Sequence, residues 1–234
     1  MKVKTKTLSS FLKKVRMSGA QSISEGVLRF EKEGLKFSAN SDAQQARVMG
    51  WLKTGAFTEY EELGNVGLND LENVVKVLDR FDDDISITKE GNLLTVKSKG
   101  KKVEIELVNE NFLNTDTNEP NLEFQETFDI TASKLHDIIK DVKMNKDATL
   151  TIKTAAKAVL FTNTGKYKFA NTIEAETCKG ELMCSFGSPF TDAVENLDGP
   201  LQISVGPNYP CKIIEKVETS IVTFIVAPIV ENEE

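Results

Sequence analysis

Apolar residues recur at helical spacing in two segments that match each other. Residues 8–17 are apolar at positions 8, 11, 12, 15 and 17, and residues 135–144 repeat this pattern at a constant offset of 127 positions. Spacings of three, one and three residues are typical of a helix with one buried face. Cations keep the same offset, because Lys13 matches Lys140 and Arg16 matches Lys143. The pattern predicts two equivalent amphipathic helices within an internal repeat.

A second helical pattern follows each of these helices. It covers residues 68–81 in the first unit and the shorter segment 189–197 in the second. Strand-like residues come next in both units, where Ser86 aligns with Ser204 and Val96 with Ile214 at an offset of 118 positions. The smaller offset predicts that the second unit has lost residues between its two helices.

Short alternating or β-branched segments surround the predicted helices. They cover residues 27–30, 35–37, 85–87, 93–96, 103–107, 148–152, 201–205 and 221–226. Gly34, Gly91 and Gly100 lie between neighbouring segments, as expected for hairpin turns. Each half therefore has strands and two helices, which predicts an α+β fold of two similar domains. Because residues 114–120 are polar and end in a proline, we expect domains at 1–113 and 125–234 joined by a connecting loop at 114–124.

Positive charge is concentrated on the predicted helices, although the chain has a net charge of -7. Lys13 points away from the apolar face of its helix, and by the repeat Lys140 takes the same outward position. Lys76 and Arg80 lie opposite the apolar stripe of residues 68–81. On a single helix, lysines that simply face solvent are the simpler interpretation. Their recurrence across the repeat favours a surface that contacts phosphates without reading bases.

Known catalytic motifs do not occur in the sequence. The single histidine, His136, lies on the flank of a predicted helix, where we expect it at the surface, and no zinc cluster or nucleophile elbow accompanies it. Asp82, Asp83 and Asp84 follow a helix without the ligand spacing of a calcium loop. We therefore expect no enzyme activity, metal or cofactor. An unrecognised carboxylate site at these three aspartates is the remaining enzymatic alternative.

The cysteines and the overall hydropathy favour an intracellular protein. Cys178, Cys184 and Cys211 form no C-x-x-C pair and are odd in number, which predicts buried thiols in a reducing compartment. No stretch of about 18 apolar residues is present, and the basic N-terminus does not lead into an apolar signal core.

Three further stretches resemble the DNA sliding clamps of the proliferating-cell-nuclear-antigen (PCNA) type. They are residues 33–46, which resemble a strand and the loop after it, residues 119–124, which resemble the end of the connecting loop, and residues 223–234, which resemble a terminal strand with an Ala-Pro pair and an acidic tail. The resemblance covers essentially the whole chain and rests on the order and spacing of these segments. It implies a homotrimeric ring around duplex DNA that tethers DNA polymerase as a processivity factor at the replication fork.

The resemblance also implies two sets of site residues. The channel contacts would be Lys13, Lys14, Arg16, Lys76, Arg80, Lys140 and Lys143. Polymerase and the clamp loader would insert short hydrophobic peptides into a pocket formed by Asn40, Gln44, Gln45, Ala46, Leu122, Phe124, Ala227, Pro228 and Ile229.

This sequence departs from the family pattern in three places. Asn40 and Ser41 replace a Met-Asp pair, Ile229 replaces a basic residue, and segment 189–197 carries acids where cations are expected. We therefore expect a more polar pocket and a channel that is more basic in its first domain. The alternative functions are a monomeric processivity factor and one subunit of a heteromeric checkpoint-type clamp.

Overall fold

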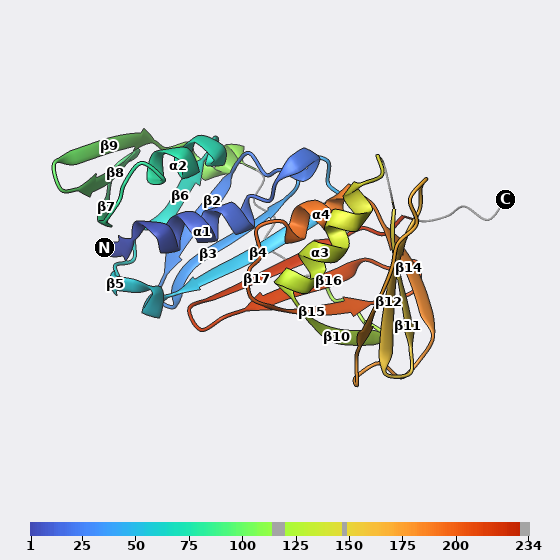
Figure 1. Cartoon of the computed structure of the whole chain (residues 1–234). Helices are drawn as coiled ribbons and strands as arrows, with labels where there is room; N and C mark the ends of the chain where they lie inside the picture. Colours follow the sequence, from blue (N-terminus) through green and yellow to red (C-terminus); the bar gives the residue numbers. More distant parts are fainter. Residues whose placement is uncertain (114–119, 147–148, 230–234) are drawn as a thin grey trace.

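The computed structural model describes residues 1–113, 120–146 and 149–229 (Figure 1). Helices in these residues are α1 (Thr5–Val15), α2 (Leu71–Leu78), α3 (Ala132–Lys143) and α4 (Ser188–Val194). Most of the expected connecting loop, the start of the strand expected at 148–152 and the acidic tail lie outside the described residues. None of the helices in the described part is long and apolar enough to cross a membrane.

Three antiparallel sheets accompany the helices. The central sheet contains, in spatial order, β10 (Glu126–Thr131), β15 (Pro200–Val205), β16 (Cys211–Lys216), β17 (Ser220–Val226), β4 (Ala46–Lys53), β3 (Gly34–Asn40), β2 (Gly26–Glu31) and β6 (Gly64–Leu68). The N-terminal sheet contains β5 (Phe57–Glu59), β1 (Lys2–Lys4), β7 (Asp84–Glu90), β8 (Leu93–Ser98) and β9 (Lys101–Glu106). The C-terminal sheet contains β13 (Ala170–Glu174), β12 (Ala158–Asn163), β11 (Leu150–Ala155) and β14 (Leu182–Phe186).

Strand order repeats between the two halves of the chain. The order β1-β7-β8-β9 in the first half corresponds to β10-β15-β16-β17 in the second, and β6-β2-β3-β4 corresponds to β14-β11-β12-β13. The central sheet forms because β17, the last strand of one half, pairs with β4, an edge strand of the other. The internal repeat expected from the helices is therefore present in the topology as well.

The four helices lie on one side of the molecule, where they cover one face of the central sheet and of the sheets next to it (Figure 1). Leu8, Phe11, Leu12 and Val15 of α1 are buried as their spacing predicts, and the equivalent stripe of α3 is buried too. Added side-chain atoms at Gly50 of β4 would overlap Val15 and Phe11, so α1 lies directly on this strand. The apolar faces therefore form one core between the helices and the sheets.

One helix begins later than expected because a side chain caps its N-terminus. Leu68 is buried as predicted, but it ends β6 and is not part of α2. The Asp70 side chain accepts a hydrogen bond from the Asn73 backbone N–H and caps α2, which therefore begins at Leu71, three residues later than expected. α3 is capped by Thr131, whose side-chain oxygen accepts a hydrogen bond from the Lys134 backbone N–H.

The residue-level alignment of the strands was wrong at both positions. Ser86 pairs with Lys2, and Gln202 pairs with Asp129, the counterpart of Lys2 in the repeat, so Ser86 corresponds to Gln202 and not to Ser204. Val96 is buried, whereas Ile214 is half-exposed between the buried residues Ile213 and Glu215 of β16. Because side chains alternate between the two faces of a sheet, a shift of one residue exchanges the buried and exposed sets. The repeat of strands holds, but Val96 and Ile214 are not equivalent.

Candidate nucleic-acid interface

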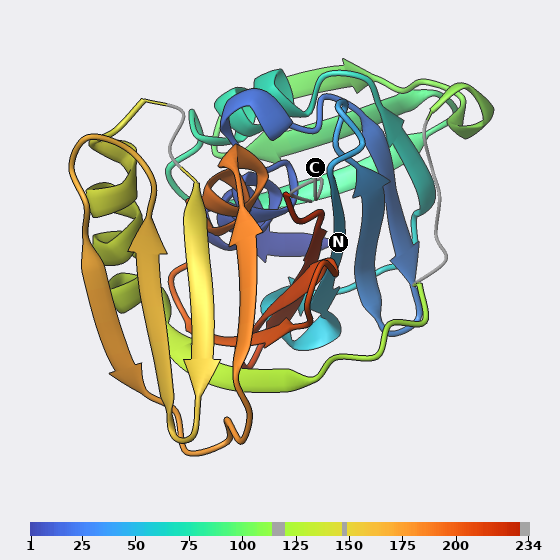
Figure 2. The same cartoon turned by 90° about the vertical axis from the view of Figure 1, so that its right-hand side faces the viewer.

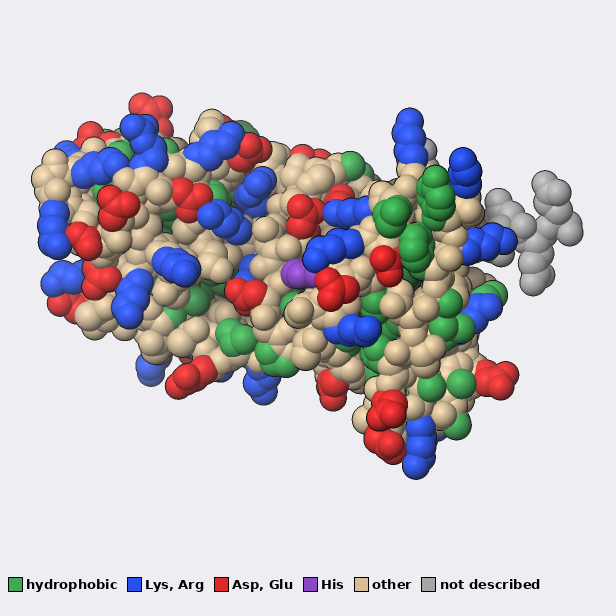
Figure 3. Space-filling view, viewed as in Figure 1, with side chains coloured by type: hydrophobic (Ala, Val, Ile, Leu, Met, Phe, Trp, Pro, Cys, Tyr) green, Lys and Arg blue, Asp and Glu red, His purple; other side chains and the backbone are tan. Residues whose placement is uncertain are grey.

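Exposed cations of α1, α2 and α3 lie on one face of the molecule. Figure 3 shows this helical face, with lysine and arginine side chains interspersed with acidic ones. Lys76 and Lys140 are well exposed and Lys13 and Lys143 are about half-exposed. The outward positions expected from the helical spacing are therefore the observed ones for Lys13, Lys76 and Lys140.

Two ion pairs hold the cations of α1 against α2. Lys13 Nζ lies 2.8 Å from Asp79 Oδ2, and Ser9 donates a hydrogen bond to the same carboxylate. Partial burial would raise the pKa of Asp79, but these two hydrogen bonds and the Lys13 charge outweigh it and lower the pKa. Lys13 is therefore exposed but already neutralised.

Glu72 of α2 lies between two further cations. Its carboxylate is 2.6 Å from Lys76 Nζ and 3.8 Å from an Arg16 guanidinium nitrogen. The hydrogen bond from Lys76 and the charges of both cations lower the pKa of Glu72. Arg16 thus lies beside α2, where its half-buried side chain borders the same surface.

The cations of α3 are paired in the same way. Lys140 Nζ is 3.0 Å from Asp137 Oδ1, and Lys143 Nζ is 3.3 Å from Glu195 Oε2, just beyond α4. Burial of the Glu195 carboxyl opposes ionisation, but the nearby Ser18 hydroxyl together with the hydrogen bond and charge of Lys143 lowers its pKa. Phosphates that bind here would have to compete with these carboxylates.

Arg80 differs from the other exposed cations of this face. It follows α2 and is exposed, and within the described residues its guanidinium has no ion pair. The backbone oxygen of Arg80 accepts a hydrogen bond from Lys101 of β9, whose ammonium also lies 4.9 Å from the Phe81 ring centroid. Arg80 is therefore the expected channel residue that is most available to an incoming phosphate.

The expectation that Lys14 is one of the channel contacts was wrong. Its side chain is 7% exposed, and Lys14 Nζ lies 2.6 Å from both Glu215 Oε2 and Asp198 Oδ1. Glu215 is fully buried and also accepts the backbone N–H groups of Asp198 and Gly199. Lys14 therefore joins the two halves of the chain and is not available on the helical face.

The acidic residues of α4 have a structural explanation. The Asp192 side chain is buried and accepts the Gln21 backbone N–H from the short helix η1 (Gly19–Gln21). This burial raises the pKa of Asp192, while the hydrogen bond from Gln21 partly opposes the rise. His136, expected at the surface, is half-buried and its Nε2 lies 2.9 Å from the Val194 oxygen. This part of α4 thus contacts the other half of the chain.

The expected peptide-pocket residues come from three segments at one end of the central sheet. The Ala227 N–H donates to the Gln45 oxygen at 2.9 Å, which joins the segment after β17 to the loop before β4. Asn40 is half-buried and accepts a hydrogen bond from Arg47 Nε. Gln44 and Gln45 are exposed, whereas Ala46 is buried. The first two segments are therefore brought together.

An aromatic residue that the sequence analysis missed anchors the third segment. The Tyr209 ring lies edge-on to Phe124 with centroids 5.8 Å apart, and its hydroxyl accepts the Glu123 N–H. Tyr209 precedes β16, whose Cys211 pairs with Val226 of β17. The turn sequence Pro207–Pro210 around an aromatic residue was the available signal. Leu122 is half-buried beside Phe124 in the same segment.

Ile229 lies apart from the rest of the expected pocket. Its N–H donates to the Ser185 oxygen, and its side chain borders a depression of about 390 Å³ that Lys143, Asn145 and Ser188 also line. Pro228 is half-buried between the two regions. The pocket expected from the sequence is therefore a surface of several segments at the end of β4 and β17.

The aspartates at positions 82–84 and the three cysteines are the other titratable groups that the sequence analysis considered. Asp82, Asp83 and Asp84 are exposed, and Asp83 pairs with Lys99 at 2.9 Å. No group of three or more His, Cys, Asp or Glu side chains that could hold a metal occurs among the described residues. The three cysteines are buried and unpaired, as expected, and burial raises the pKa of the Cys184 thiol to about 12.

Comparisons with known proteins identify the fold. No protein-family model and no curated protein matches the sequence. Among solved structures, PCNA from A. fulgidus with the C-terminal region of FEN-1 bound gives a TM-score of 0.85 at 18% identity, over 99% of this chain and 98% of that chain. PCNA from Entamoeba histolytica gives 0.84 at 17% identity over 98% of both chains.

A third solved structure agrees with these two. The PCNA2–PCNA3 complex from Sulfolobus tokodaii gives a TM-score of 0.78 at 18% identity, over 99% of this chain and 100% of that chain. All three matches extend over nearly the whole of both chains. This chain therefore has the α+β fold of the PCNA-type sliding clamps, with two similar domains.

Proposed function

We propose that this chain is one subunit of a DNA sliding clamp, a ring that encircles duplex DNA and tethers DNA polymerase and other replication or repair proteins. The observation that carries the proposal is the row of exposed cations on α1, α2 and α3 of an otherwise acidic chain. These cations share one face of the molecule (Figure 3). Such a surface suits contact with the phosphate backbone of DNA whatever its base sequence.

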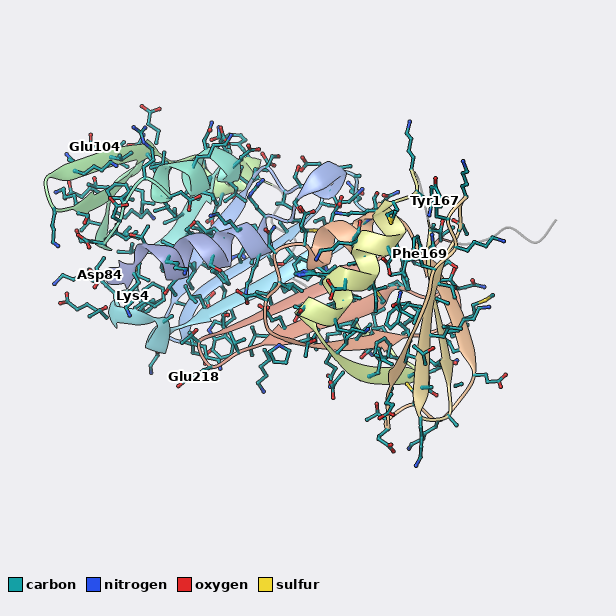
Figure 4. The ribbon with its side chains drawn as sticks, viewed as in Figure 1. Lys4, Asp84, Glu104, Tyr167, Phe169 and Glu218 are labelled. Atoms are coloured by element: carbon teal, nitrogen blue, oxygen red, sulfur yellow. The ribbon has the colours of Figure 1, made fainter. Side chains whose placement is uncertain are left out.

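Two unpaired sheet edges support assembly into a ring. Within the chain, β17 pairs with β4. Their counterparts in the repeat are β9 and β13, and both are edge strands of their sheets. Glu104 on β9 and Tyr167 and Phe169 beside β13 lie at opposite ends of the molecule (Figure 4). Pairing of β9 with β13 of the next copy would repeat the internal junction head-to-tail, and three copies would close the ring.

The charges along these two edges are complementary. β9 begins with Lys101 and Lys102 and ends with Glu106, whereas β13 follows Lys168 and ends with Glu174. In an antiparallel pair the basic start of one strand lies beside the acidic end of the other. This polarity is compatible with antiparallel pairing of β9 with β13.

The ion pairs of the cations suit a ring that slides. Lys13, Lys76, Lys140 and Lys143 already have carboxylate partners, so exchange of such a partner for a phosphate changes little in free energy. Weak contacts of this kind let a ring move along DNA, and retention then depends on encirclement. The channel contacts that we propose are Lys13, Arg16, Lys76, Arg80, Lys140 and Lys143.

We also propose that partner proteins bind beside the connecting loop. The described parts of this surface are Asn40, Gln44 to Ala46, Leu122, Phe124, Ala227 to Ile229 and Tyr209. The A. fulgidus neighbour was solved with the C-terminal region of FEN-1, which supports recognition of a partner segment. Polymerase and a clamp loader are the partners that we expect, within an intracellular replication complex.

The rival forms are a monomeric processivity factor and a subunit of a heteromeric clamp. The PCNA2–PCNA3 complex is a precedent for unlike subunits. Solution mass distinguishes these forms, because a homotrimer has three times the 25.9 kDa of one chain. A mass of one chain at every concentration contradicts the homotrimer, and assembly only with another polypeptide supports the heteromeric form.

Retention on closed DNA tests the clamp itself. The chain is loaded with its cognate loader onto nicked circular plasmid, and half of the sample is then linearised with a restriction enzyme. We expect the protein to stay on the circle and to slide off the linear molecule within the same time. Equal retention on both substrates would refute encirclement.

A further inference from the structure

An apolar strip lies on the outer face of the central sheet, where the two halves of the chain join. Gly50 faces α1, so its neighbours Met49 and Trp51 on β4 point to the opposite face. Ile221 of β17 pairs with Trp51 and shares that face. Met49, Trp51 and Ile221 are all half-buried without a helix above them in the described residues.

These residues line a preformed groove of about 330 Å³ together with Arg29 and Lys36. Trp51 Nε1 donates to the Glu33 oxygen at 3.1 Å, which fixes one edge of the indole ring. Lys53 Nζ lies 5.9 Å from the ring centroid. The indole is therefore held in one orientation, with part of its surface open to a ligand.

Cations stand at both ends of the strip. The strand register places Arg29, Lys36, Trp51, Ile221 and Lys216 in one row across β2, β3, β4, β17 and β16. Lys36 is paired with Glu31 at 2.8 Å. Within the described residues, by contrast, no ion pair involves Arg29 or Lys216. The two terminal cations of the row thus remain available to carboxylates in a chain whose net charge is -7.

The length of the row sets the size of a matching ligand. Four strand-to-strand steps of about 4.8 Å separate Arg29 from Lys216, which gives roughly 19 Å. An extended chain of about six residues has this length. A bulky apolar residue near its middle would then lie over Trp51, Met49 and Ile221.

We infer that this groove binds an extended acidic peptide segment of a partner protein. Its apolar residue packs on Trp51, and carboxylates on either side of that residue pair with Arg29 and Lys216. The groove lies across β2, β3, β4 and β17, away from Gln45 and Ala227, so it is distinct from the proposed pocket beside the connecting loop. The inference does not depend on a ring or on DNA.

Trp51 provides a direct measurement because it is the single tryptophan of the chain. The full chain is titrated with the peptide Glu-Ser-Ser-Phe-Ser-Ser-Glu while tryptophan emission is recorded. We expect a saturable change in emission. Peptides with lysine in place of both glutamates, or alanine in place of phenylalanine, should bind about five- to tenfold more weakly.

Paired variants assign the site. R29Q/K216Q should lower the affinity for the glutamate peptide about five- to tenfold, measured by anisotropy of a labelled peptide. The matched control K153Q/K179Q removes the same charge from exposed lysines of the C-terminal half and should bind as the parent does. W51A should weaken binding as well, with circular dichroism confirming that each variant is folded.

Several outcomes would overturn the inference. Equal affinity for the lysine and glutamate peptides would exclude charge recognition, and equal losses in both double variants would indicate unspecific attraction. Unchanged affinity of folded W51A would place the peptide elsewhere. Emission that changes with protein concentration alone, in step with the mass, would show that a second copy occupies the groove. None of these results bears on retention of the clamp on circular DNA.

Discussion

Lys14 of α1 and Glu215 of β16 form a buried ion pair across the two halves of the chain, with 2.6 Å between Nζ and Oε2. A helix of the first half is thereby tied to a strand that lies 201 residues further along the chain. Breaking a buried pair by removal of one partner leaves the other charged and desolvated.

We therefore expect K14M to lower the free energy of unfolding by about 3 kcal/mol. The matched variant K13M, which removes an exposed pair of the same helix, should cost about 0.5 kcal/mol. Urea denaturation followed by circular dichroism measures both values. Equally small effects of the two variants would show that the Lys14–Glu215 pair contributes little to the free energy of unfolding.

Arg80 should contribute more to DNA binding than its paired neighbours. Among the described residues Arg80 has no ion pair that must break when a phosphate binds, whereas Lys13 must first separate from Asp79. We expect R80Q to reduce the slope of log affinity against log salt by about 1 on short duplex DNA. K13Q should change the slope less. Anisotropy titrations from 50 to 200 mM salt test this, and a larger effect of K13Q would contradict it.

The Lys13–Asp79 pair should make stability depend on pH in acid. Because the pKa of Asp79 is lowered in the folded chain, its contribution is fully present above the pKa of the unfolded chain. It is lost as pH falls through the lower folded value, below about pH 4. We expect the stability difference between the parent and D79N to shrink between pH 5 and pH 2.5 in urea titrations. A constant difference over this range would contradict the assignment.

The charge pattern of β9 and β13 should control assembly. At the internal junction Ile225 pairs with Arg47, and their counterparts in the repeat are Glu104 of β9 and Lys168 before β13. E104K therefore places a cation opposite Lys168 of the proposed neighbour, so we expect the trimer to dissociate at about tenfold higher concentration. Adding K168E to E104K should restore assembly, because the two charges are then exchanged. Sedimentation at several concentrations gives the masses. K153E, which changes an exposed lysine of the interior strand β11, is the control, and failure of the double variant to recover would exclude this contact.

The helices and the repeat could be predicted because their evidence is local. The apolar stripe of α1 and its copy in α3 depend on spacing within about ten residues, and the structure buries both stripes. Gly34, Gly91 and Gly100 have positive φ in the turns where the pattern placed them. Local spacing also gave the outward positions of Lys13 and Lys140.

Features that depend on distant residues could not be predicted in the same way. A helical wheel places Lys14 on a flank, but only the tertiary fold brings Glu215 to it. Likewise, the acids of α4 have no local explanation until η1 packs against Asp192. Tyr209 joins Phe124 from a separate turn, and no spacing rule connects them. The resemblance supplied the segments of the peptide pocket, and the contacts between them came from the structure.

The continuous central sheet has a consequence for how such a ring would open. Seven residue pairs join β17 to β4, and the Lys14–Glu215 pair spans the same junction. A hinge inside the subunit would have to break this ladder and expose a desolvated charge. Pairing of β9 with β13 would instead involve strands of six and five residues, without a buried ion pair of their own in the described chain. The gate through which DNA enters should therefore lie between subunits, with each subunit moving as a rigid arc.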